Sequence, residues 1–223
     1  MTASARTAYG AGIVASGIVL VLSLQHRVDV HLTPLEAVAV VTYGWSTWLL
    51  AENKPSGWWV GLVGCALYAF IFYRVRLFAD FGIQVFYFVT SVQAIVIWLR
   101  GGAGHTEKPV GHAGARWLVT ASVLGLIATF GLRSVLIGWR DAAPFWDAFT
   151  TVFSLIAQLL LMGRYIESWY FWIVVDAVYV PLYVTRGLYL TSILNLIFLA
   201  LAVQGLRTFR HALNPTTFKT TTV

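Results

Sequence analysis

Charged side chains are scarce in this sequence. Lys, Arg, Asp and Glu make up 11% of its 223 residues, whereas 59% are hydrophobic and the mean hydropathy is +0.76. Soluble globular proteins carry about 25% charged and about 45–50% apolar residues. The composition therefore excludes a protein whose main solvent is water, and with it a soluble enzyme or a disordered tail.

Cysteine is almost absent, and the basic residues are not clustered. Cys65 is the single cysteine and lies within an apolar run, which excludes an intrachain disulfide. The net charge is +6, but Lys and Arg stand singly between apolar runs and do not form the stripe typical of nucleic-acid binding. Loop charges that orient membrane helices explain this distribution better, so no nucleic acid partner is expected.

Long uncharged stretches, in contrast, are abundant. A helix needs about 20 residues to cross a bilayer, and a shorter one can use flanking charged side chains that reach the interface. The runs are continuous and not alternating, which excludes strands. We predict an all-α, polytopic membrane helix bundle in a lipid bilayer. The eight candidate spans are 7–26, 37–51, 55–73, 81–99, 117–132, 148–163, 168–185 (interrupted only by Asp176) and 187–206.

The first span, 7–26, follows Arg6 and has a signal peptide as its alternative interpretation. Its apolar body is longer than a typical signal core, and residues 25–29 (QHRVD) are not a small-residue cleavage site. We therefore favour an additional N-terminal membrane helix.

Counting Lys and Arg on alternate sides of an eight-span chain predicts its orientation. Cytoplasmic loops are enriched in these residues, and one side carries nine of them against six, which favours both termini in the cytoplasm. The nine are Arg6, Lys54, Arg100, Lys108, Arg116, Arg164, Arg207, Arg210 and Lys219, and the six are Arg27, Arg74, Arg76, Arg133, Arg140 and Arg186.

An internal repeat organises the sequence, because a shift of 111 residues aligns 56–100 with 167–211 without a gap. We predict two parallel three-helix repeats joined by a linker helix (3+1+3), a class known among transporters; a bundle without a repeat is the alternative. The matches are Trp58 with Trp169, Tyr68 with Tyr179, Leu77 with Leu188, Gln93 with Gln204, Gln84 with Asn195 and Phe78 with Tyr189. The predicted segments are 1–34 (extra helix and loop), 35–100 (first repeat), 101–140 (polar loop and linker helix), 141–211 (second repeat) and 212–223 (tail).

One span carries the strongest candidate site. Asp176 is the only carboxylate deep within a hydrophobic stretch, and burying its charge costs several kcal/mol unless a partner offsets it. Trp169 and Trp172 precede it by seven and four residues, which places all three near one helix face. Two indoles and an acid suit a flat cation. The alternatives are a structural hydrogen bond or protonation for Asp176, and a membrane-interface belt for the tryptophans.

Amide and phenol side chains in the spans are further candidates. Gln84 and Asn195 occupy matching repeat positions and could line a wet cavity, or could simply hydrogen-bond neighbouring helices. Tyr87 and Tyr179 are weaker candidates of the same kind. Pro181, in the span of Asp176, frees a backbone carbonyl and allows a kink.

The signals of an enzyme are missing from the sequence. No phosphate-binding loop and no set of nucleophile, base and orienting residue is visible. His26, Asp29 and His31 lack a further ligand, so neither a metal nor a cofactor is expected.

Several stretches resemble the bacterial nicotinamide riboside transporters of the PnuC type. The similarity covers about 35–100 and 140–210. It is carried by 77–80 (LFAD), 84–88 (QVFYF), 145–147 (FWD), 165–172 (YIESWYFW) and 186–189 (RGLY).

This resemblance implies a 3+1+3 core and facilitated diffusion of an unphosphorylated vitamin precursor, which a cytoplasmic kinase traps as the nucleotide. It implies that Trp169 and Trp172 pack against the substrate and that Gln84 binds it. The sequence departs from the family pattern at Asp176 and Gly64, where Asn is common, and at 93–94, where Gln-Ala replaces Gly-Trp.

The cargo is ranked by its chemistry, since related transporters carry thiamine or riboflavin. Nicotinamide riboside and thiamine are flat cations, whereas riboflavin is neutral and larger, so we expect them in that order. Proton-coupled transport through Asp176 is one alternative, and a non-transporting membrane subunit or enzyme is another. A homo-oligomer is possible.

Overall fold

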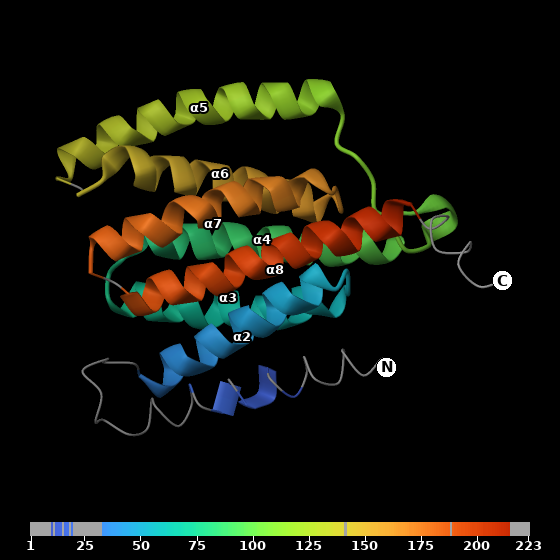
Figure 1. Cartoon of the computed structure of the whole chain (residues 1–223), viewed down its shortest axis with the longest axis horizontal. Helices are drawn as coiled ribbons and strands as arrows, with labels where there is room; N and C mark the ends of the chain where they lie inside the picture. Colours follow the sequence, from blue (N-terminus) through green and yellow to red (C-terminus); the bar gives the residue numbers. More distant parts are fainter. Residues whose placement is uncertain are drawn as a thin grey trace. The chain divides into compact units, whose positions relative to one another are not determined.

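The computed structural model describes residues 33–140, 142–187 and 189–214, together with isolated positions between 10 and 19. Its regular structure is helical (Figure 1), which confirms the predicted all-α class. The predicted span 7–26 falls mostly outside the described residues. The elements are α2 (Pro34–Ala51), α3 (Ser56–Arg74), α4 (Phe78–Arg100), the short 3₁₀ helix η1 (Ala103–His105), α5 (Ala115–Gly138), α6 (Pro144–Met162), α7 (Glu167–Thr185) and α8 (Tyr189–Leu213).

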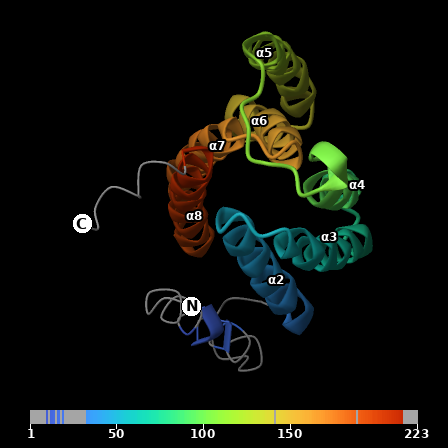
Figure 2. The ribbon, with the colours of Figure 1, turned by 90° about the vertical axis from the view of Figure 1, so that its right-hand side faces the viewer.

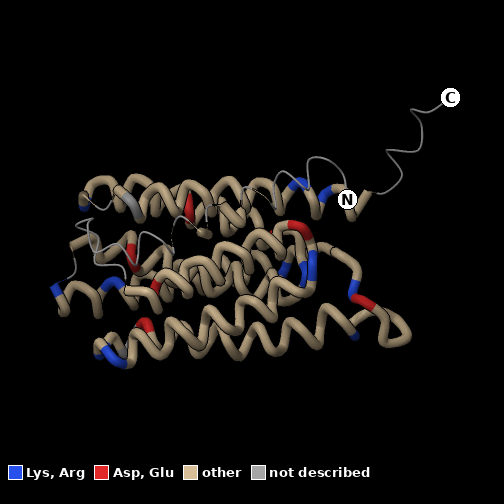
Figure 3. Tube along the Cα trace, turned by 90° about the horizontal axis from the view of Figure 1, so that it is seen from below, with Lys and Arg blue, Asp and Glu red and all other residues tan. Residues whose placement is uncertain are grey.

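Six helices within the described residues, α3 to α8, are long and apolar enough to cross a membrane. Lys and Arg lie near the helix ends (Figure 3), for example Arg74 and Arg100 in the last turns of α3 and α4. Large apolar side chains such as Leu124, Ile127 and Phe130 of α5 are exposed. Because lipid solvates such side chains, this distribution fits a multi-pass membrane protein.

The helices form two compact units. The first contains α2, α3 and α4 up to Val92, and the second contains residues 51–54 and the chain from Gln93 onward. In the second unit α5 packs on α6, α6 on α7 and α7 on α8 (Figure 2). Stacked rings of Phe149, Phe153 and Phe171 connect α6 with α7, with centroids 4.3 and 5.9 Å apart. Aromatic packing therefore holds the helix that carries the candidate site.

Helix boundaries and turn conformations recur at the 111-residue interval. Both ends of α3 and α7 correspond at this interval, as do the ends of α2 and α6 and the starts of α4 and α8. Left-handed backbone also recurs, at Asn53 (φ 56°) and Arg164 (φ 55°) and again at Arg76 (φ 62°) and Gly187 (φ 72°). A duplicated sequence would produce this correspondence; the repeat and the spatial arrangement of the two triplets stay predictions.

Candidate functional site

Helix α7 places Trp169, Trp172 and Asp176 along one face. Trp169 is 2% exposed and Asp176 is 6% exposed, whereas Trp172 is half-buried. Positions i, i+3 and i+7 of a helix lie within about 60° of one another, so the three side chains project to the same side. The grouping predicted from the sequence spacing is thus compatible with the observed helix.

Asp176 has no hydrogen-bond donor or ion-pair partner among the residues that the structure describes. An ionised carboxylate without a partner is expensive in an apolar environment, and a bound cation removes that cost. The chemistry that Asp176 offers is therefore one negative charge, or one exchangeable proton, midway along a helix of 19 residues.

Trp169 lies between α7 and α8. Its ring meets Phe209 edge-on at a centroid distance of 5.4 Å, and a Cβ on Gly205 would lie 2.5 Å from its indole. The indole Nε1 is buried and has no acceptor among the described residues. Trp169 therefore fills a helix interface and keeps one hydrogen-bond donor unused.

The other predicted residues of the second unit make local contacts. Tyr179 stacks on Tyr183 with centroids 5.3 Å apart. Asn195 is buried, and its Nδ2 donates to the Thr191 carbonyl of its own helix at 2.8 Å. Ser192 of α8 donates to the Val180 carbonyl, next to Pro181, at 2.9 Å. The last contact links α8 to α7 beside Pro181, one turn after the Ala177 carbonyl that the proline leaves without its backbone donor.

Gln84 and Tyr87 belong to the first unit, on α4. The Tyr43 hydroxyl of α2 donates to Gln84 Oε1 at 2.5 Å. The Tyr87 ring lies beside Phe86, with centroids 5.9 Å apart. Tyr43 was not predicted from the sequence, because a tyrosine in an apolar span resembles an ordinary packing residue until its partner is known.

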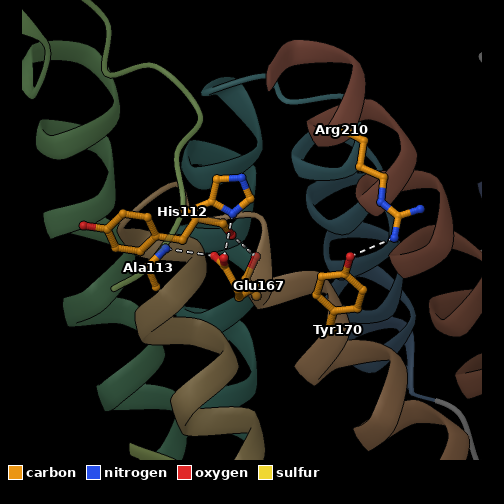
Figure 4. A network of polar contacts seen from close by, with 7 residues as sticks. His112, Ala113, Glu167, Tyr170 and Arg210 are labelled. Atoms are coloured by element: carbon orange, nitrogen blue, oxygen red, sulfur yellow. Dashed lines mark hydrogen bonds and ion pairs between the residues drawn. The ribbon is translucent and has the colours of Figure 1, made fainter. Parts of the chain in front are cut away.

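A polar network that was not predicted from the sequence anchors the start of α7 (Figure 4). Glu167 accepts a hydrogen bond from the Ala113 N–H at 3.0 Å and contacts His112 Nδ1 at 2.8 Å. Arg210 of α8 donates to the Tyr170 hydroxyl at 2.7 Å. Glu167 also suits the first turn of a helix, where backbone N–H groups favour negative charge. These contacts fix the helix that carries Trp169, Trp172 and Asp176.

Arg164 fixes the turn before α7. Its Nε donates to Asn53 Oδ1 at 3.0 Å and its Nη1 to the Lys108 carbonyl at 2.5 Å, and the guanidinium lies 4.5 Å from the centroid of the Trp98 ring. Burial lowers the pKa of the guanidinium, while the carboxylate of Glu107 opposes this shift. Arg164 was predicted only as a loop charge, yet its side chain is 6% exposed.

Membrane-length helices and a buried acid on the same helix face as two indoles define a polytopic membrane protein with a candidate site for a small cationic molecule. Residues 33–211 match the family described as nicotinamide mononucleotide transporter, and the chain belongs to this family. The protein is therefore a transporter and not an enzyme, as the sequence predicted.

Relatives and a solved structure agree with this assignment. The chain is 25% identical over 203 residues to the nicotinamide riboside transporter PnuC of Escherichia coli K12, covering 78% of this chain and 83% of the relative. It is 30% identical over 162 residues to the protein of that name from Neisseria mucosa, covering 67% and 59%. The crystal structure of the vitamin B3 transporter PnuC has the same fold, with a TM-score of 0.65, 24% identity and 92% of each chain covered.

Proposed function

We propose that this protein carries nicotinamide riboside across the bacterial inner membrane by facilitated diffusion. The relatives described above are named for that substrate. The two triplets alternate access to a site near the middle of the membrane. A cytoplasmic kinase then traps the transported nicotinamide riboside as the nucleotide. Both termini are cytoplasmic in this proposal, as the distribution of Lys and Arg favours.

The carboxylate of Asp176, which has no partner among the described residues, carries the proposal. Nicotinamide riboside is a flat pyridinium with one positive charge, so the acid balances its charge while indole faces attract the ring. Trp172 is half-buried and one turn from Asp176, which supports a stacking role. The indole N–H of Trp169, which has no acceptor in the described part of the protein, supplies a donor for a ligand oxygen. Thiamine, also a flat cation, ranks second, and neutral riboflavin third.

Uptake of labelled nicotinamide riboside into proteoliposomes that contain only this protein tests the proposal. Trp172→Ala and Asp176→Asn should each raise the KM about tenfold or more, because each removes an interaction worth about 1.5–3 kcal/mol in a dry site. Trp139→Ala is the matched control, since Trp139 is 68% exposed after the end of α5. No uptake by the wild type, or equal KM values in all variants, would contradict the proposal and favour a non-transporting subunit.

A further inference from the structure

Three polar side chains from α2, α3 and α4 form a chain of contacts inside the first unit. Tyr43 Oη lies 2.5 Å from Gln84 Oε1 and 3.3 Å from Cys65 Sγ. Cys65 is buried, and Tyr43 and Gln84 are half-buried. The Tyr43 hydroxyl therefore stands between a thiol and an amide, and all three come from different helices.

The Tyr43 ring is held in one place. It meets the Tyr68 ring edge-on at a centroid distance of 5.3 Å, and it lies over Gly64, where a Cβ would be 2.7 Å from Tyr43 Cδ2. Glycine at this position leaves the space that the ring occupies. The direction of the Tyr43 hydroxyl is thus set by packing, before any hydrogen bond is considered.

Hydrogen-bond chemistry decides which of these three side chains donates to which. A phenol has one proton, and an amide oxygen is a far better acceptor than sulfur. Tyr43 therefore donates to Gln84 Oε1, and the Cys65 thiol donates to the Tyr43 oxygen. Because Oε1 accepts this hydrogen bond, a flip of the Gln84 amide that swaps Oε1 and Nε2 would break it. Its Nε2 has no hydrogen-bond partner in the described part of the chain.

The positions that correspond at the 111-residue interval are arranged differently. They are Ser154, Asp176 and Asn195. Ser154 donates to the Thr151 carbonyl and Asn195 to the Thr191 carbonyl, both within their own helices, and Asp176 has no partner among the described residues. Within the described residues, the set of the first unit therefore leaves the N–H₂ group of Gln84 without a partner, whereas the set of the second unit leaves the carboxylate of Asp176.

We propose that Tyr43, supported by Cys65, is a positioning residue that locks the Gln84 amide so that its N–H₂ group faces the substrate and recognises a hydrogen-bond acceptor. This inference rests on the proposed function, because Gln84 is taken as a substrate-binding residue. It makes the first unit selective for a ligand oxygen, such as that of a carboxamide or a ribose hydroxyl. Ligands that present only a donor at this point are rejected.

A double-mutant cycle separates positioning from simple packing. In the proteoliposome assay, Tyr43→Phe should raise the KM for nicotinamide riboside about 3- to 10-fold with an unchanged maximal rate, the effect of one hydrogen bond. In a Gln84→Ala background the same change should have no further effect, because Tyr43 acts through Gln84. Equal KM increases in both backgrounds would overturn the positioning role. Tyr68→Phe is the control, because it removes a neighbouring hydroxyl that takes no part in the contacts of Cys65, Tyr43 and Gln84.

A second measurement needs no ligand. Cys65 is the single cysteine, so the infrared S–H stretching band of the protein reports on this thiol alone. The band should lie at the lower frequency of a hydrogen-bonded thiol, move to that of a free thiol in Tyr43→Phe, and stay unchanged in Tyr68→Phe. An identical band in the wild type and Tyr43→Phe would show that the Cys65 thiol does not donate to Tyr43 and would overturn the proposed direction of these hydrogen bonds. Absence of nicotinamide riboside transport would contradict the proposed function instead, and the thiol band would still decide the direction.

Discussion

Arg164 donates a hydrogen bond to Asn53, a residue that precedes it by the repeat interval of 111 positions. Both have left-handed backbone, with φ of 55° and 56°. Trp98 and Phe209 are separated by the same interval, and their ring centroids are 6.1 Å apart. Both contacts join residues that the predicted repeat would make equivalent, and both lie within the second unit.

Replacing Arg164 with Lys should destabilise the protein although the charge is kept. A lysine ammonium cannot reach Asn53 Oδ1 and the Lys108 carbonyl together, so a half-buried acceptor loses its donor. We expect a loss of about 2–4 kcal/mol, read as a lower unfolding temperature in detergent by tryptophan fluorescence. Arg207→Lys, at an exposed position on α8, should stay within about 0.5 kcal/mol. Similar losses in the two variants would refute this role of Arg164.

Glu167 and His112 should contribute unequally to the anchor of α7. The His112 side chain is 68% exposed, so its contact with Glu167 is solvated and contributes little to stability. Glu167 also accepts a hydrogen bond from the Ala113 N–H. This N–H lies just before α5, where backbone N–H groups have no acceptor within the helix. Glu167→Ala should therefore cost about 1–2 kcal/mol, and His112→Ala should cost much less. Thermal unfolding of both variants checks this order, and a larger effect of His112→Ala would reverse it.

The sequence was sufficient to place the helices. The uncharged stretch 55–73 became α3 (Ser56–Arg74), and 168–185 became α7 (Glu167–Thr185). Membrane helices are set by a local property, the length of apolar sequence between charges, so hydropathy alone locates them. The helical spacing of Trp169, Trp172 and Asp176 was readable for the same reason.

The contacts between helices were not readable from the sequence. Tyr43 meets Gln84 across 41 positions, and Glu167 meets Ala113 across 54. Such pairs depend on which helices touch and at what rotation, and an apolar sequence allows many choices. Arg164 shows the consequence most clearly. A charge between two spans looks like a solvent-facing loop residue, and only its contacts show that it is buried.

Membrane orientation can be checked with two introduced cysteines. Ala103, in η1, and Ala142, before α6, are both exposed and lie at opposite ends of α5. In a Cys65→Ser background, Ala142→Cys should react with an impermeant maleimide in intact spheroplasts, and Ala103→Cys only after lysis. This follows from the positive charge that places the loop after α4 in the cytoplasm. The opposite labelling pattern would invert the predicted orientation.

Asp176 should set charge selectivity without coupling transport to protons. If transport is facilitated diffusion, wild-type uptake of nicotinamide riboside is the same with and without a pH gradient. Asp176→Asn, which keeps the shape but not the charge, should raise the KM for this cation about 10- to 100-fold. Stimulation of the wild type by a pH gradient, lost in Asp176→Asn, would instead establish proton coupling through this residue.

Gly205 should be essential to the position of Trp169. A Cβ at Gly205 would lie 2.5 Å from the indole, so Gly205→Ala must displace the ring from its place against Phe209. We expect a loss of about 1–3 kcal/mol in stability, together with a higher KM, because Trp169 shares a helix face with Trp172. Gly131→Ala is the matched control on α5, where a Cβ meets nothing within 4 Å. Alanine is the better helix former by about 1 kcal/mol, so Gly131→Ala should leave the KM unchanged and raise the unfolding temperature slightly. If Gly205→Ala behaved in the same way, Trp169 would have room to move, and the tight packing between α7 and α8 could not be what fixes the candidate site.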